Sequence, residues 1–146
     1  MNKDLKYIML IDDDEDDNYF HEKAIKKNNP ENIVIIKTSG ILALEYLEPV
    51  NNAGPRPDLI FLDINMPRMN GWEFLDAYNL LDKKQQSEAI IIMLATSQNL
   101  QGKTQSKSWG FAFDYITKPL TPDIIQEIVK KYFPHYNGFK PLSIFP

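Results

Sequence analysis

Three carboxylates follow two apolar runs of the sequence and are the first candidates for chemistry. Asp12 and Asp13 come directly after the run 7–11, and Asp63 comes directly after the run 59–62. Each run ends abruptly in charge, which is typical of a strand buried on both faces of a sheet. Carboxylates clustered at such strand ends repel one another and normally require a hard cation such as Mg²⁺. A third carboxylate in the same crevice makes an oxygen-rich site, which also suits a carboxylate nucleophile.

The four acids that continue this run, residues 14–17, have a simpler interpretation. They predict a solvated acidic loop leading into a helix N-terminus, where the helix dipole favours negative charge. Asp63 is different, because the next helix-start signal comes later, at Asn70 and Gly71. Asp63 is therefore not needed as a helix cap.

A lysine follows another apolar segment, the short pair 115–116. Lys118 precedes Pro119, and a Lys-Pro pair by itself is typical of a surface turn. Beside three carboxylates, Lys118 becomes their counter-charge. A cation placed over an acyl phosphate would also neutralise charge on its oxygens, as lysine does in phosphoryl transfer.

The elements that must position these side chains alternate along the chain. Short apolar runs predict five strands, at 7–11, 33–36, 59–62, 90–94 and 115–116. Amphipathic segments predict five helices, at 18–27, 41–47, 71–81, 101–109 and 121–132. This alternation favours a doubly wound α/β fold, a parallel sheet with helices on both faces. In such sheets ligands bind beyond the carboxyl ends of the strands, where the three carboxylates and the lysine lie.

Composition bounds the class of protein further. The chain has 146 residues, 43% of them hydrophobic, and 16 basic against 20 acidic residues, for a net charge of −4. The acidic balance disfavours direct nucleic-acid binding, and the lack of cysteine excludes thiolate metal sites and cysteine nucleophiles. No segment resembles a signal peptide or a membrane span, so we expect a cytoplasmic protein that does not bind membranes.

The ordered set of motifs closely resembles the receiver domain of two-component response regulators, over about residues 5–133. It consists of Asp12-Asp13, Leu62-Asp63-Ile64-Asn65-Met66-Pro67 with Asn70-Gly71, the hydroxyls of Thr96 and Ser97, and Tyr115-Ile116-Thr117-Lys118-Pro119. The resemblance implies a flavodoxin-like five-stranded parallel sheet of strand order 2-1-3-4-5. We expect a single receiver domain at 5–133 and a tail at 134–146 that is too short for an output domain.

The resemblance also implies a reaction. Asp63 would accept a phosphoryl group from a sensor histidine kinase or a histidine phosphotransfer protein. Asp12, Asp13, Asp63 and the backbone carbonyl of Asn65 would hold Mg²⁺, with Mn²⁺ as the alternative ion. Lys118 would contact the phosphoryl oxygens.

The remaining implied roles concern the switch rather than an enzyme cycle. Tyr115 matches the aromatic residue whose orientation follows phosphorylation in the family, and the Lys118–Pro119 bond is cis in many members. The altered surface, formed by the fourth helix, fifth strand and fifth helix, would pass the signal to an unknown downstream protein. At most, the phosphoryl group would be lost by slow autodephosphorylation.

One family position is ambiguous in this sequence. The family expects a Thr or Ser at the end of the fourth strand, and counting back from Lys118 gives Thr96. Aligning Gly110 with the glycine that precedes the fifth strand gives Ala95 instead. An extra residue is easier to absorb in the loop before Tyr115 than inside the preceding helix, so we favour Ala95.

Two other functions fit part of the pattern. A Mg²⁺-dependent phosphohydrolase acting through an aspartyl phosphate could use the Asp-x-Asp at 12–14, but this chain has no room for a substrate-selecting cap. A phosphorylation-independent binding module could keep the same fold. The presence of Asp12, Asp13, Asp63 and Lys118 argues against that module.

Overall fold

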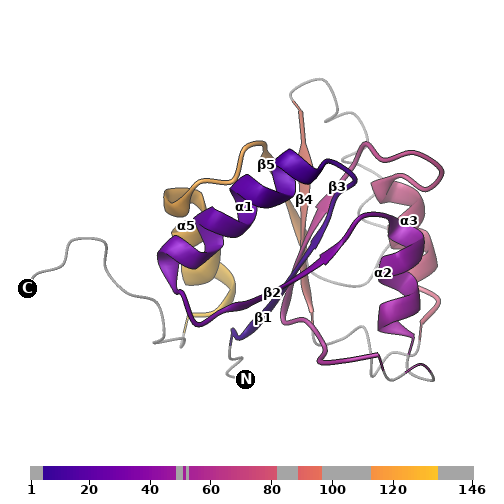
Figure 1. The fold of residues 1–146 in the computed structure, drawn as a ribbon, viewed down its shortest axis with the longest axis horizontal. Coiled ribbons are helices and arrows are strands. Elements are labelled where there is room, and N and C mark those ends of the chain that lie inside the picture. The colour runs from indigo at the N-terminus through magenta and orange to yellow at the C-terminus, as the bar shows by residue number, and fades with distance from the viewer. Residues whose placement is uncertain (1–4, 49–50, 52, 82–88, 97–112, 135–146) are drawn as a thin grey trace, which may run out of the picture.

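The computed structural model describes residues 5–48, 51, 53–81, 89–96 and 113–134. These residues contain one five-stranded sheet of order β2-β1-β3-β4-β5, in which every paired strand is parallel (Figure 1). The strands are β1 (Tyr7–Ile11), β2 (Ile33–Lys37), β3 (Leu59–Asp63), β4 (Ile90–Ala95) and β5 (Phe113–Thr117). The predicted strand order and the doubly wound α/β class are confirmed.

Helices cover both faces of this sheet. One face carries α1 (Glu15–Asn28) and α5 (Pro122–Tyr132), and the other carries α2 (Gly40–Leu47) and α3 (Gly71–Tyr78) (Figure 1). The predicted helix at 101–109 lies outside the described residues. Of the helices that are described, none combines the length and apolar character needed to cross a membrane.

The central strand β3 feeds two hydrophobic cores. Ile60 and Leu62 pack into the core under α2 and α3, whereas Leu59 and Phe61 pack into the core under α1 and α5. All four side chains have no exposed surface, and each such burial contributes roughly 1.5–3 kcal/mol. A strand covered on both faces therefore has a continuous apolar sequence, and its end is fixed rigidly in space.

The edge strand β2 corrects one expectation. Its sequence predicts burial on both faces, but Ile33 is 42% exposed and Ile36 is 38% exposed. The reason is position, since β2 lies at the edge of the sheet beside β1. Apolar composition alone does not distinguish an edge strand from a central one.

The helix ends are set by capping side chains. Asp14 caps α1 by accepting hydrogen bonds from the backbone N–H groups of Asp16 and Asp17, so α1 begins at Glu15 rather than at the predicted residue 18. The other described helices are capped by Ser39, Asn70 and Thr121. The acids after Asp14 therefore form the first turn of α1 rather than a loop, where the dipole stabilises them.

Candidate functional site

The carboxyl ends of β1 and β3 bring the three predicted carboxylates together. β1 and β3 are neighbours, with Ile11 opposite Leu62, so the acids that follow them lie side by side. Asp12, Asp13 and Asp63 each offer an oxygen atom, and these atoms lie within 4.8 Å of one another. Asp12 and Asp63 are buried, while Asp13 is exposed to solvent. The cluster thus has two buried members and one that opens to solvent.

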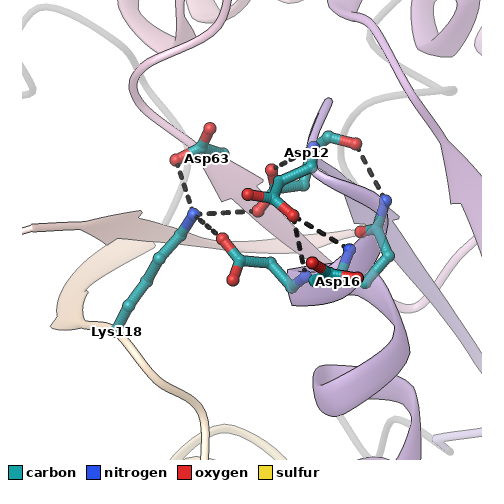
Figure 2. Close-up of polar contacts among 7 residues, drawn as sticks. Asp12, Asp16, Asp63 and Lys118 are labelled. Carbon is teal, nitrogen blue, oxygen red and sulfur yellow. Dashed lines mark hydrogen bonds and ion pairs between the residues drawn. The ribbon is translucent and has the colours of Figure 1, made fainter.

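Lys118 reaches the same crevice from the end of β5. Its ammonium Nζ lies 3.2 Å from Asp63, 3.0 Å from Asp12 and 2.8 Å from Asp17. Figure 2 shows the lysine side chain pointing between Asp63 and Asp12. An ammonium group has three N–H donors. The three carboxylates can therefore each take one of them.

Burial dominates the electrostatics of these acids. Desolvation, together with the negative charge of Asp12, raises the pKa of Asp63 to about 6, although Lys118 and a backbone hydrogen bond from Asn65 act in the opposite direction. Burial also raises the pKa of Asp12. For Lys118, burial alone would lower the pKa, but the contacts with Asp17, Asp12 and Asp63 raise it overall. One cation thus offsets only part of the negative charge in the crevice.

This donor set fits a hard divalent cation. All three clustered side chains offer oxygen, and no softer nitrogen or sulfur ligand belongs to the described cluster. Carboxylate oxygens are the preferred protein ligands of Mg²⁺. A divalent ion would also offset the charge that raises the pKa of Asp63. The group Asp12, Asp13 and Asp63 can therefore bind a metal.

The loop after Asp63 is fixed by a close backbone approach. The N–H of Ile64 donates to Leu94 of β4, and the N–H of Gly71 donates back to Ile64. A Cβ atom on Gly71 would lie 2.9 Å from the Ile64 Cα and 3.0 Å from the Asp63 carbonyl oxygen. Only glycine allows α3 to begin this close to Asp63. The loop residue Asn65, proposed as a carbonyl ligand, is exposed.

The predicted switch residues lie on β4, β5 and the loop after β5. The Tyr115 ring lies 5.9 Å, between centroids, from the ring of Trp72 in α3. Ala95 is the last residue of β4 and is buried, whereas Thr96 follows the strand and is exposed. The Lys118 N–H donates to the Ala95 carbonyl, and the Lys118–Pro119 bond is cis.

Sequence reasoning missed two residues that contact the site. Asp17 was grouped with the solvated acids, yet it makes the shortest contact to Lys118. Asn18 is buried, and its amide donates to the Asp12 carbonyl oxygen at 2.9 Å. The available signal was that the acidic run leads directly into a helix. With Asp14 as the cap, Asp17 lies in the first turn of α1, near the carboxyl ends of the strands.

The sequence matches the response regulator receiver domain family over residues 8–130. The chain belongs to this family, whose members act as switches in two-component signalling and are phosphorylated by histidine kinases or phosphotransfer proteins. This confirms the resemblance inferred from the motifs. The acidic cluster of Asp12, Asp13 and Asp63 fits the phosphorylation site of such a domain.

Two relatives illustrate the extent of the match. Sporulation initiation phosphotransferase F of Bacillus subtilis is 38% identical over 79 residues, which is 54% of this chain and 60% of that protein. Protein-glutamate methylesterase/protein-glutamine glutaminase 3 of Burkholderia thailandensis is 32% identical over 113 residues, 77% of this chain but 29% of that protein. In both cases the match spans less than two thirds of the relative.

Solved structures match over more of their length. A two-component response regulator from Cytophaga hutchinsonii has a TM-score of 0.73 at 27% identity, covering 90% of this chain and 97% of that chain. The phosphorylated cyanobacterial phytochrome response regulator RcpA has a TM-score of 0.71 at 26% identity, covering 90% and 95% respectively. These similarities support a receiver fold.

Proposed function

We propose that this protein is a phosphorylation-dependent switch in which Asp63 accepts a phosphoryl group in a Mg²⁺-dependent reaction. The donor is a sensor histidine kinase or a histidine phosphotransfer protein, and an unknown downstream protein binds the altered surface. The observation that carries this proposal is the convergence of Lys118 and two further carboxylates on buried Asp63. The Bacillus relative's name, a phosphotransferase, supports the same chemistry.

In the proposed reaction, an ionised oxygen of Asp63 attacks phosphorus in line. A bond forms between that oxygen and phosphorus as the bond from phosphorus to the donor's histidine nitrogen breaks, and the imidazole keeps the electron pair. Lys118 neutralises charge on the phosphoryl oxygens, and the fixed geometry of the crevice does most of the remaining work.

Four groups of this chain would hold the cation: the carboxylates of Asp12, Asp13 and Asp63, and the backbone carbonyl of Asn65. When bound, Mg²⁺ supplies charge neutralisation for the transferring group, and Mn²⁺ would serve similarly. The burial of Asp12 and Asp63, which are 2% and 4% exposed, supports this assignment. Without an ion, the positive charge beside these two carboxylates does not balance their negative charge.

The readout would involve the residues around β5. Tyr115 would change orientation when Asp63 is phosphorylated, and its contact with Trp72 gives the change a route toward α3. Because the family is one of signalling switches, we assign no enzymatic turnover to the chain beyond slow autodephosphorylation. Residues 5–133 would form the receiver unit, in a cytoplasmic protein.

Labelling with a small phosphodonor tests the proposal. Incubation with acetyl phosphate and Mg²⁺ should add one phosphoryl group, which intact mass spectrometry detects, and Asp63→Asn should abolish the addition. Asp58→Asn is the matched control, because it makes the same change at the other end of β3. Labelling of Asp63→Asn at the parent rate would overturn the assignment. Sustained release of phosphate over many turnovers would instead favour a phosphohydrolase.

A further inference from the structure

Asp17 makes an ion pair that the proposed reaction does not account for. Its carboxylate Oδ2 lies 2.8 Å from the Lys118 Nζ, closer than the carboxylates of Asp12 and Asp63. Asp17 comes from the first turn of α1, whereas Lys118 follows β5, 101 residues later. Asp17 does not belong to the described cluster of acids able to hold a metal. Its role therefore differs from that of the other two partners of Lys118.

The difference matters because those two partners have competing tasks. Asp12 and Asp63 are proposed ligands of the cation, and Asp63 is also the proposed phosphoryl acceptor. A carboxylate that shares its charge with a divalent ion attracts an ammonium group less strongly, and the ion itself repels that group. Asp17 is the partner of Lys118 whose charge stays fully available.

The backbone also suits Asp17 for holding a side chain in place. Its N–H and that of Asp16 are fixed by the Asp14 cap, and the next residue, Asn18, is anchored to the Asp12 carbonyl oxygen. The Asp17 side chain is 35% exposed, against 17% for Lys118. It therefore approaches the ammonium from the solvent side of the crevice, while Asp12 and Asp63 approach from the buried side.

We propose that Asp17 is a positioning residue, which holds the Lys118 ammonium beside Asp63 when the other carboxylates bind the cation and the phosphoryl group. This inference rests on the proposed function of Asp63. It assigns to the start of α1 an indirect part in phosphoryl transfer, exerted through Lys118. Losing the charge of Asp17 would leave Lys118 free to move out of the crevice once the cation is bound.

The test compares three variants of the full chain. Asp17→Asn removes the contact, Asp17→Glu keeps the charge, and Asp16→Asn removes the same charge from the neighbouring position. Asp16 is the matched control because its side chain is exposed and makes none of the described contacts with Lys118. The first readout is the ¹⁵N NMR signal of the Lys118 ammonium, which is assigned by its absence in Lys118→Arg. This signal reports the ion pair because hydrogen bonding slows the proton exchange that otherwise broadens the ammonium signal.

In the parent and in Asp16→Asn, the ammonium signal should persist when Mg²⁺ is added. In Asp17→Asn it should be lost on adding Mg²⁺, while the backbone amide spectrum stays that of a folded protein. The second readout is the rate of labelling by acetyl phosphate at saturating Mg²⁺. It should fall by about five- to tenfold in Asp17→Asn, as expected for a partly exposed charge-assisted hydrogen bond, and recover in Asp17→Glu.

Two results would overturn the inference. The first is an ammonium signal and a labelling rate in Asp17→Asn that equal those of Asp16→Asn. The second is faster labelling of Asp17→Asn, which would mean that Asp17 withholds Lys118 from the phosphoryl group. Both results presuppose that the parent is labelled at Asp63, so they are distinct from failure of the proposed function, in which the parent is not labelled there.

Discussion

Two aspartates lie at opposite ends of the central strand β3, and they have different roles. Asp58 precedes the strand, and its carboxylate accepts hydrogen bonds from the backbone N–H groups of Lys6 and Tyr7 at 2.9 and 3.0 Å. Its own backbone bridges the sheet, donating to Tyr7 and accepting from Ile90. Asp63 ends the strand and instead shares a single side-chain cation with other acids.

The contrast shows what separates a structural carboxylate from a reactive one. Backbone N–H groups are held in place by the fold, so the hydrogen bonds to the Asp58 carboxylate persist in the folded protein and link β1 to the start of β3. Asp63 is buried, and its pKa is raised to about 6 because desolvation and a neighbouring acid outweigh Lys118. Added positive charge would therefore stabilise the ionised form of Asp63. The same residue type therefore supports the fold at one end of the strand and provides chemistry at the other.

The largest expected effect comes from removing the cation at the reactive end. Lys118→Met leaves Asp12 and Asp63 buried without their ammonium partner, and breaking a buried pair in this way costs about 3 kcal/mol. We expect urea unfolding at pH 7 without metal to show this loss, and added Mg²⁺ to recover much of it.

Lys131→Met is the control for Lys118→Met. Lys131 pairs with Asp114 at 2.9 Å, but its side chain is 63% exposed. Its removal should leave stability nearly unchanged, since solvent screens exposed pairs. Equal losses of stability in the two variants would show that the buried carboxylates do not depend on Lys118 for charge compensation.

The next effect is a gain in stability from removing the charge of Asp63. A pKa raised from 3.8 to about 6 means that the folded state holds this proton more tightly than the unfolded chain does. The ionised carboxylate therefore costs up to about 3 kcal/mol above pH 6, and this cost vanishes as the pH falls toward 3.8. Without metal, Asp63→Asn should be more stable than the parent at pH 7.

Unfolding measured from pH 7 down to pH 4 in the presence of a chelator checks this difference. The gap between Asp63→Asn and the parent should close across that range, and Mg²⁺ should narrow it at pH 7 by stabilising the parent. A gap that does not depend on pH would contradict the raised pKa of Asp63.

A smaller effect is expected at the structural end. Asp58→Ala leaves the N–H groups of Lys6 and Tyr7 without their acceptor, which costs about 2 kcal/mol. Asp58→Asn keeps an acceptor oxygen and should lose less. Thermal unfolding measures both variants, and labelling at Asp63 should continue in each. Loss of labelling in a folded Asp58→Ala protein would erase the distinction between the two ends of β3.

The smallest effect concerns the end of β4 beside the reactive aspartate. If Ala95 occupies the family's hydroxyl position, Thr96→Ala should leave the phosphorylation-linked change at Tyr115 nearly untouched, and Ala95→Thr should strengthen it. NMR of the beryllofluoride-treated protein measures that change. Its loss in Thr96→Ala would show that the spacing from Lys118 was the better guide.

The sequence by itself determined the class of fold and four charged residues of the site, Asp12, Asp13, Asp63 and Lys118. Continuous apolar runs predicted β1, β3 and β4, because strands buried on both faces need apolar residues throughout. Since all parallel strands end at one edge of the sheet, the acids after β1 and β3 could be assigned to that edge from their positions alone. The start of α3 was equally clear from Asn70 and Gly71, and in the structure Asn70 and Glu73 form a capping box there.

Only the tertiary structure decided which groups are partners. The exposed residues of β2 and the backbone contacts of Asp58 depend on which strands are neighbours, and local sequence patterns do not specify that. Lys118 meets Asp17 across 101 residues and Asp12 across 106. Such contacts arise when helices pack onto the sheet and fix the distance between side chains. The sequence therefore reveals charged residues of the site, whereas packing determines which carboxylates share the Lys118 ammonium.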